Sequence, residues 1–160
     1  MSQETLETPI DLLRFQLRTT MSMEEDSLAA LGDLEKAAPS TEVQELFRHH
    51  AEETREQIDN LRKVFDLFEF PVSTAGSPAT KGISSQAHSL IERTSKPLLD
   101  QVTLTCALGN EHYEISVYQS LIVAATAQAA TEAVALLNSN LDQETHTSEE
   151  LHATLKQLAG

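Results

Sequence analysis

The sequence has few of the residues on which β-rich or irregular folds depend. It contains no tryptophan, and aromatic residues make up only 4% of its 160 residues. Leucine, alanine, valine and isoleucine must therefore build the core, which favours packed helices over sheets. Five glycines and five prolines leave little material for the many turns of a β-sandwich. We expect long helices in a single domain covering residues 1–160.

Basic residues, cysteines and long apolar runs are also scarce. The 11 Lys and Arg residues against 25 Asp and Glu give a net charge of −14, which repels nucleic-acid phosphates and anionic lipids. The one cysteine, Cys106, cannot form an internal disulfide and is most simply a small buried apolar residue. The N-terminus lacks the basic and apolar regions of a signal peptide. The most apolar stretch, residues 121–130, is too short to span a bilayer. We expect a cytoplasmic protein without nucleic-acid or membrane partners.

Four stretches repeat apolar residues at spacings of three and four, which predicts helices over about 9–38, 41–70, 97–126 and 129–158. Thr8 followed by Pro9 is a typical start for the first of them. Residues 71–96 are rich in Ser, Thr, Ala and Gly and show only a short helical pattern near 83–91. The connections are thus short, long and short. This order predicts an all-α, ferritin-like antiparallel four-helix bundle whose long crossover carries a short extra helix.

Each predicted long helix has a glutamate within its apolar face. These residues are Glu24, Glu53, Glu111 and Glu144. Glu24 and Glu53 lie 15 and 14 residues from the first short turn, and Glu111 and Glu144 each lie 16.5 residues from the second. At a rise of 1.5 Å per residue, these separations are about 21 to 25 Å. We therefore expect the four carboxylates to meet halfway along the bundle.

Buried carboxylates must be protonated, matched by basic residues or bound to cations, because an unpaired buried charge costs several kcal/mol. The predicted seams offer no lysine or arginine at this height. His50 lies one turn before Glu53, and Glu114 lies one turn after Glu111, so both can add ligand atoms. The predicted set of metal ligands is Glu24, His50, Glu53, Glu111, Glu114 and Glu144. Alternatively, each glutamate could extend to water, and His50 could be a hydrogen-bonded core residue.

The remaining polar aromatic side chains are less specific. Tyr113 and Tyr118 are expected in the core, although a phenol beside a metal can also donate a hydrogen bond or an electron. Four further histidines are expected at the surface or at an interface: His88, His112, His146 and His152.

With these residues the sequence resembles the bacterial ferritin-like stress proteins that include YciE and YciF, over about residues 10–159. In the first helix, Glu24 matches the glutamate of the family's LxxLYSAEKQL run. In the second, HHAEETREQIDNLRKVFDLF resembles HLEETxxQxxRLxxVF. In the third, NEHYEISVYQSL is close to EHYEIAxY, the most specific piece. In the fourth, LDQETHTSEEL shares little more than Glu144 with LxEExxAxxxL.

The resemblance implies a ferritin-like bundle, a homodimer, a metal site at mid-bundle and a role in oxidative or osmotic stress. The expected cofactor is a divalent metal, with iron as the first candidate. The sequence departs from the family at Ser77 and Thr80, where a cysteine and a methionine are usual. It also lacks the Glu-x-x-His pairs of the wider di-iron proteins, because Glu56 and Thr147 stand at the histidine positions. A site short of histidine could instead accept manganese, magnesium or calcium.

The sequence leaves the activity open. With iron or manganese bound, the site would support oxidase- or peroxidase-type redox chemistry, with Glu53 and Glu144 as the expected bridging ligands. One alternative is a non-catalytic bundle for binding or assembly, in which any metal is structural. Another alternative is an iron-storage cage.

Overall fold

The computed structural model describes residues 3–160, and this part of the chain is almost entirely helical and contains no strand. Residues 1 and 2 of the predicted domain lie outside the described residues. The helices are α1 (Pro9–Ala37), α2 (Thr41–Leu67), α3 (Pro78–Glu92), the 3-10 helix η1 (Lys96–Leu98), α4 (Leu99–Ala127) and α5 (Thr131–Ala159). None of the helices in residues 3–160 is long and apolar enough to cross a membrane.

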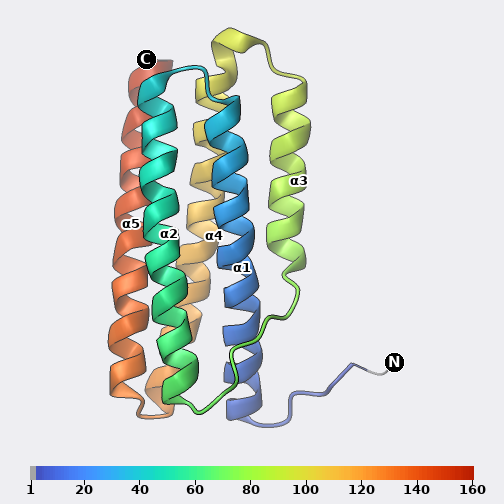
Figure 1. Ribbon diagram of the computed structural model, residues 1–160, viewed down its shortest axis with the longest axis vertical. Coiled ribbons are helices and arrows are strands. Elements are labelled where there is room, and N and C mark those ends of the chain that lie inside the picture. The colour runs from blue at the N-terminus through green and yellow to red at the C-terminus, as the bar shows by residue number, and fades with distance from the viewer. Residues whose placement is uncertain (1–2) are drawn as a thin grey trace.

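The four long helices form an antiparallel bundle with one long crossover (Figure 1). Helices α1 and α2 make a hairpin whose turn lies at one end of the bundle, and α4 and α5 make a second hairpin whose turn lies at the opposite end. Because the crossover returns the chain along the bundle, α2 and α4 run in the same direction. This connectivity confirms the predicted all-α, ferritin-like bundle with an extra helix in the crossover.

The helix ends show where local chemistry decides the boundaries. Thr8 caps α1 as predicted: its hydroxyl accepts the backbone N–H of Asp11, while the Asp11 carboxylate accepts the N–H of Thr8. Helix α2 stops three residues before its predicted end at residue 70. Glu69 adopts a left-handed φ of 57°, and the N–H of Phe70 donates to the carbonyl oxygen of Phe65 at 3.0 Å. This closed turn redirects the chain before it enters the crossover.

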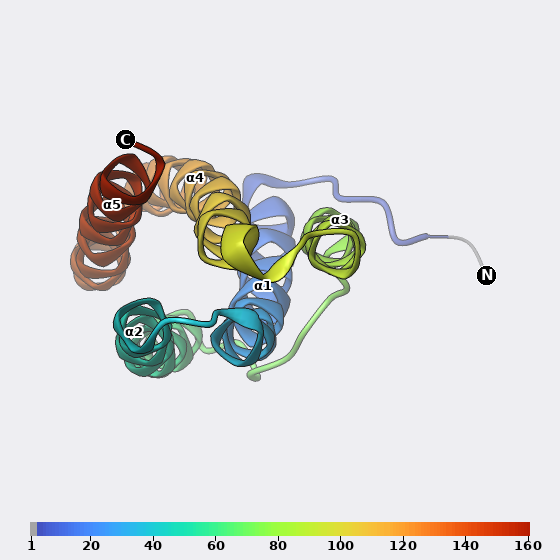
Figure 2. The ribbon, with the colours of Figure 1, turned by 90° about the horizontal axis from the view of Figure 1, so that it is seen from above.

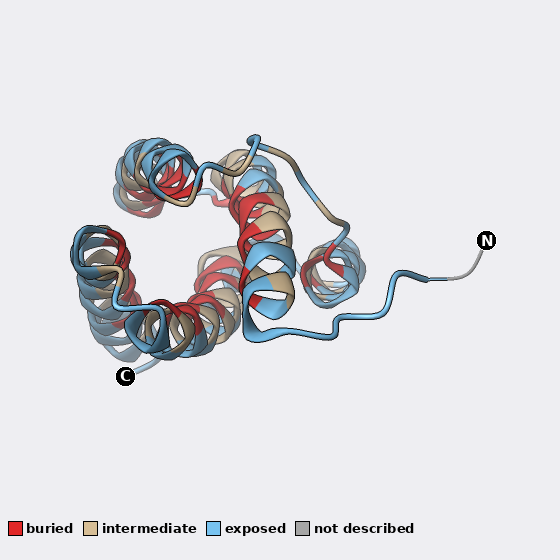
Figure 3. Ribbon diagram, turned by 90° about the horizontal axis from the view of Figure 1, so that it is seen from below, coloured by how far each residue is buried: buried red, intermediate tan, exposed pale blue. Residues whose placement is uncertain are grey.

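The buried residues of the four long helices lie on their inner faces (Figure 3). The apolar ones among them form two clusters. The cluster near the α1–α2 turn includes Leu31, Val43, Phe47, Leu104 and Leu151. The cluster toward the opposite end includes Leu13, Leu17, Phe65, Leu121 and Leu137.

A layer of buried polar side chains separates these two clusters, and every long helix contributes to it. Its members are Glu24, Ser27, Thr54, Gln57, Glu111, Glu114, Asn140, Glu144 and Thr147. Burying polar groups costs free energy unless they are paired, so a layer of this size marks a place where stability is not the only requirement. We refer to these residues as the polar layer.

Helix α3 lies outside the bundle, beside α1 and α4 (Figure 2). Only two of its residues are buried, and it is longer at both ends than its apolar pattern indicated. Polar contacts attach it to α1: the hydroxyl of Thr80 donates to Asp26 Oδ2 at 2.8 Å, and Lys81 Nζ lies 2.7 Å from Asp26 Oδ1. One helical heptad further along, His88 Nε2 lies 3.2 Å from Asp33 Oδ2. The pairs at Lys81 and His88 are solvent-exposed and contribute little to stability.

Candidate metal centre

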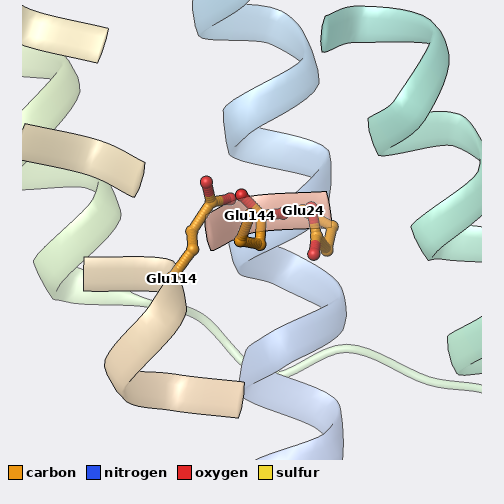
Figure 4. Close-up of side chains that lie close together, drawn as sticks. All are labelled: Glu24, Glu114 and Glu144. Carbon is orange, nitrogen blue, oxygen red and sulfur yellow. The ribbon is translucent and has the colours of Figure 1, made fainter. Parts of the chain in front are cut away.

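Three glutamates from three different helices meet in the polar layer (Figure 4). Glu24 of α1, Glu114 of α4 and Glu144 of α5 each offer a carboxylate oxygen, and these oxygens lie within 4.8 Å of one another. The side chains are 0%, 1% and 3% exposed, respectively. Helical geometry explains the meeting, since residues equally far from a hairpin turn lie at the same height. Three like charges would repel one another strongly here if all were ionised.

Glu111 is the fourth member of this group, which we call the glutamate cluster. It lies one turn before Glu114 on α4 and is 3% exposed, and the charges of Glu144, Glu114 and Glu24 all raise its pKa. Carboxyl groups buried this close together favour the protonated form, because each charge opposes the ionisation of its neighbours.

Neutral side chains hold the cluster in place. Tyr118 donates a hydrogen bond to Glu24 Oε1, and Asn140 Nδ2 donates to the Tyr118 hydroxyl at 3.1 Å. Asn110 Nδ2 donates to Glu114 Oε2 at 3.1 Å. The contacts from Tyr118 and Asn110 each engage one oxygen of a carboxyl group. The second oxygens, Glu24 Oε2 and Glu114 Oε1, are buried with no hydrogen-bond partner among residues 3–160.

Burial and mutual repulsion raise the pKa values of the whole cluster. Removal from water is the largest cause for all four carboxyl groups and raises the pKa of Glu24, Glu111 and Glu114 well above the usual range. The charge of Glu144 adds to the effect on the other three. Within the described part of the chain, no lysine or arginine forms an ion pair with any member. The cluster must therefore be neutralised by protons or by cations.

The other two predicted ligands, His50 and Glu53, form a separate pair on α2. His50 Nδ1 lies 3.1 Å from Glu53 Oε2, which also accepts the hydroxyl of Thr147 at 3.0 Å. Burial would raise the pKa of Glu53, but the hydrogen bonds from His50 and Thr147 outweigh it and lower the pKa. His50 Nε2 is buried without a hydrogen-bond partner in the described chain, 3.8 Å from Glu150 Oε2. The charges of both residues affect the pKa of Glu144, so the pair adjoins the cluster without joining it.

Other sequence predictions can be compared directly with the structure. Tyr118 is fully buried in the core, as predicted, whereas Tyr113 is half-buried. Cys106 is half-buried rather than buried, and this partial burial raises the pKa of its thiol. The four histidines predicted at the surface are all exposed: His88, His112, His146 and His152.

Sequence reasoning missed the amides that support the cluster. Asn140 lies four residues before Glu144 and therefore on the same helical face, and Asn110 bears the same relation to Glu114. Asn140 links three elements of the layer, because its Nδ2 also donates to the Gln57 carbonyl oxygen at 3.2 Å. The i, i+4 spacing from a buried carboxylate was the signal that could have identified both asparagines.

The Tyr118 hydroxyl provides a first test of this arrangement. Burial, reinforced by the charge of Glu24, raises the phenol pKa well above its usual value, so the hydroxyl stays protonated and donates. Tyr118→Phe removes the donor to Glu24 Oε1 and is expected to cost about 1–3 kcal/mol of unfolding free energy, measured by urea denaturation. Tyr113→Phe, on the same helix and half-buried, is the control. Equal stability of the two variants would contradict a structural role for this hydrogen bond.

Comparison with known proteins identifies the family. Residues 8–160 match the family described as Domain of unknown function (DUF892). The chain belongs to the DUF892 family. The match covers all five α-helices, so the polar layer and the crossover helix α3 both lie within the DUF892 domain.

Individual relatives agree with this assignment. Protein YciF of Escherichia coli K12 is 29% identical over 149 residues, which cover 92% of this DUF892 chain and 88% of YciF. The crystal structure of the E. coli stress protein YciF matches with a TM-score of 0.91 and 26% identity, covering 96% of this chain and 98% of that one. YcfI from Rhodopseudomonas palustris, described as a candidate structural protein, matches with a TM-score of 0.90 and 29% identity, covering 95% and 98%. The family resemblance inferred from the sequence is confirmed.

A more distant structure supports the fold alone. A protein from Xanthomonas campestris pv. campestris matches with a TM-score of 0.78 at 20% identity, covering 95% of this chain and 94% of that one.

Proposed function

We propose that this DUF892 protein binds divalent metal at the glutamate cluster, with iron as the first candidate and manganese, magnesium and calcium as the others. One observation carries the proposal: Glu24, Glu114 and Glu144 bring carboxylate oxygens from three helices within 4.8 Å of one another in a buried site. Such a convergence of acids costs free energy unless a positive charge offsets it.

The available donor atoms fit a hard cation. Glu24 Oε2, Glu114 Oε1 and Glu111 Oε2 are buried oxygens without hydrogen-bond partners in the described residues, so they are free to act as ligands. The cluster offers only oxygen donors, which suit magnesium, calcium and manganese as well as ferrous iron. Tyr118 and Asn110 would act as supporting residues, because each engages one oxygen of a ligand and fixes the direction of the other.

The pair on α2 supports a second ion beside the first. Glu111, Glu144, Glu53 and His50 would be the residues that hold this second ion, because the charges of Glu53 and His50 both act on Glu144. His50 Nε2 has no partner in the described chain and offers a nitrogen ligand. When iron or manganese is bound, such a centre supplies two-electron reduction of dioxygen or peroxide. The chain's own part is to hold the ligands, to keep bulk water out and to retain the phenol proton of Tyr118 beside Glu24.

One relative supports the stress role in the proposed biological setting. E. coli YciF is described as a stress protein. By extension, we propose that this chain acts in oxidative or osmotic stress, in the cytoplasm and as a homodimer.

A second candidate function is a non-catalytic bundle for binding or assembly. Two observations favour it: YcfI is described as a candidate structural protein, and the raised pKa values of Glu24, Glu111 and Glu114 allow protons to neutralise part of the cluster without any cation. In this alternative the polar layer serves only to align the helices.

Elemental analysis separates the two candidates. Protein purified without chelator should contain about one to two divalent ions per chain, and metal-stripped protein should rebind Mn²⁺ in a calorimetric titration. The test is repeated with ferrous iron under nitrogen to compare the two metals. Protein that carries no metal and rebinds none would leave the assembly function as the better proposal.

A further inference from the structure

A small cavity lies between α1, α3 and α4, directly beside the glutamate cluster. Its walls are mostly apolar and come from Ala30, Leu31, Ile83, Ala87 and Ala107. At the bundle side it is lined by Glu111, Asn110 and Ser27, which also belong to the cluster or contact it. At the outer side it reaches Asp33 and His88, which are exposed.

The cavity is very small. Its volume is about 30 Å³, and a cavity needs about 10–15 Å³ to hold one water. It can therefore hold about two waters or one diatomic molecule. Cavities walled by apolar groups tend to stay dry and take up apolar gases such as xenon. The Cys106 thiol on the wall is only a weak hydrogen-bond former and changes this little.

Charge restricts the occupant further. The outer rim carries Asp26 and Asp33, which lie beside Lys81 and His88, and the inner end carries Glu111, so the lining offers an anion no unpaired basic side chain. A hydrated cation would lose its water shell against the apolar walls without gaining ligands along them. Neither restriction applies to a small neutral molecule.

We propose that this cavity binds dioxygen and delivers it to the glutamate cluster through Glu111. Helix α3 forms the outer wall and is attached to α1 by the hydrogen bond from Thr80 to Asp26 and by the exposed pairs of Lys81 with Asp26 and of His88 with Asp33. Only two of its residues are buried, so brief local separation of α3 opens the cavity. Delivery rests on the proposed function, whereas gas binding itself requires no metal.

The test uses the metal-free, full-length chain in methyl NMR spectroscopy under oxygen pressure. Dioxygen is paramagnetic, so a methyl group beside bound gas relaxes faster. The methyl groups of Ala87 and Leu31 should show enhancements at least about threefold above those of Leu13 and Leu137, which lie in the apolar cluster at the other end. Under xenon pressure, the same cavity methyls should shift.

Two cavity-filling variants give the matched comparison. Ala87→Val and Ala30→Val, on opposite walls, should each remove most of the enhancement, whereas Ala79→Val, exposed on α3, should leave it unchanged. The measurement on the wild-type protein tests gas binding even if one variant folds poorly. The proposal is overturned if the cavity methyls show contacts to bound water and no oxygen enhancement, or if the enhancement survives both variants. A protein that binds gas but no metal would refute only the proposed function. A protein that binds metal but no gas would refute only gas binding.

Discussion

Glu144→Gln is expected to weaken Mn²⁺ binding at least about 100-fold, because loss of a supporting hydrogen bond alone typically costs 10–100-fold in metal affinity and this change removes a ligand charge. Glu144 is the best single target, since it is one of the three converging carboxylates and its charge raises the pKa of Glu24, Glu111 and Glu114. The amide has the shape of the carboxyl group and suits a buried site, so the variant should still fold. Calorimetric titration of the metal-stripped protein measures the change.

The matched control is Glu149→Gln, on the same helix and exposed. Its affinity should stay within about twofold of wild type, because a screened surface charge contributes little. The double variant Glu24→Ala with Glu144→Ala removes two of the three converging ligands. If that protein is purified with an unchanged metal content, the glutamate cluster is not the metal site.

The metal-free protein is expected to become more stable as the pH falls from about 8 to about 5.5, contrary to the usual behaviour of proteins rich in carboxylates. In the folded state, burial raises the pKa values of Glu24, Glu111, Glu114 and Glu144 above their unfolded values. The folded protein then binds more protons than the unfolded chain. The associated stability is complete below the unfolded pKa values and is lost as the pH rises through the folded ones.

The expected slope is up to about 1.4 kcal/mol per pH unit for each carboxyl group that titrates in the window. One kcal/mol corresponds to about 2–4 °C in Tm for a chain of this size. Glu53 acts in the opposite direction, because its folded pKa is lowered and its contribution is lost only as the pH falls through that value. Thermal melts above about pH 5 therefore exclude the titration of ordinary carboxyl groups, since an unperturbed Glu titrates near 4.3.

Saturating Mn²⁺ should reverse this profile. Protons and metal compete for the same carboxylates, so stabilisation by metal should grow as the pH rises. Glu144→Gln should flatten the profile of the metal-free protein, because it removes one titrating group and its repulsion of the others. Identical Tm values at about pH 5.5 and about pH 8 would contradict the shared burial of these carboxyl groups.

The sequence predicts the height of the candidate site well because helices are regular. A fixed rise per residue converts the distances of Glu24, Glu111 and Glu144 from their turns into positions along the bundle axis. The same regularity puts Glu114, one turn from Glu111, on the same face. These four residues do meet in the polar layer.

Position around the helix axis was less predictable. His50 is buried as the spacing indicated, but Glu53 is 16% exposed and turns toward His50 and Thr147. Successive residues on a helix are rotated by about 100°. A small error in the predicted direction of a side chain therefore decides whether it points into the glutamate cluster or toward the edge of the bundle. The hydroxyl of Thr147 donates a hydrogen bond to Glu53, and sequence spacing alone does not predict this contact. The end of α2 was also hard to predict, because the residue in the left-handed conformation there is Glu69 and not the glycine that usually marks such a position.

The polar layer also makes the local stability of the bundle uneven along its length. Apart from Leu28, which packs against both apolar clusters, it separates one cluster from the other, so the middle of the bundle has the least apolar packing. The two ends can therefore unfold locally and largely independently of each other. Hydrogen exchange of the backbone amides should resolve them as two groups of protected sites. A cation held by α1, α4 and α5 would connect these helices at the polar layer and merge the two groups of protected sites into one.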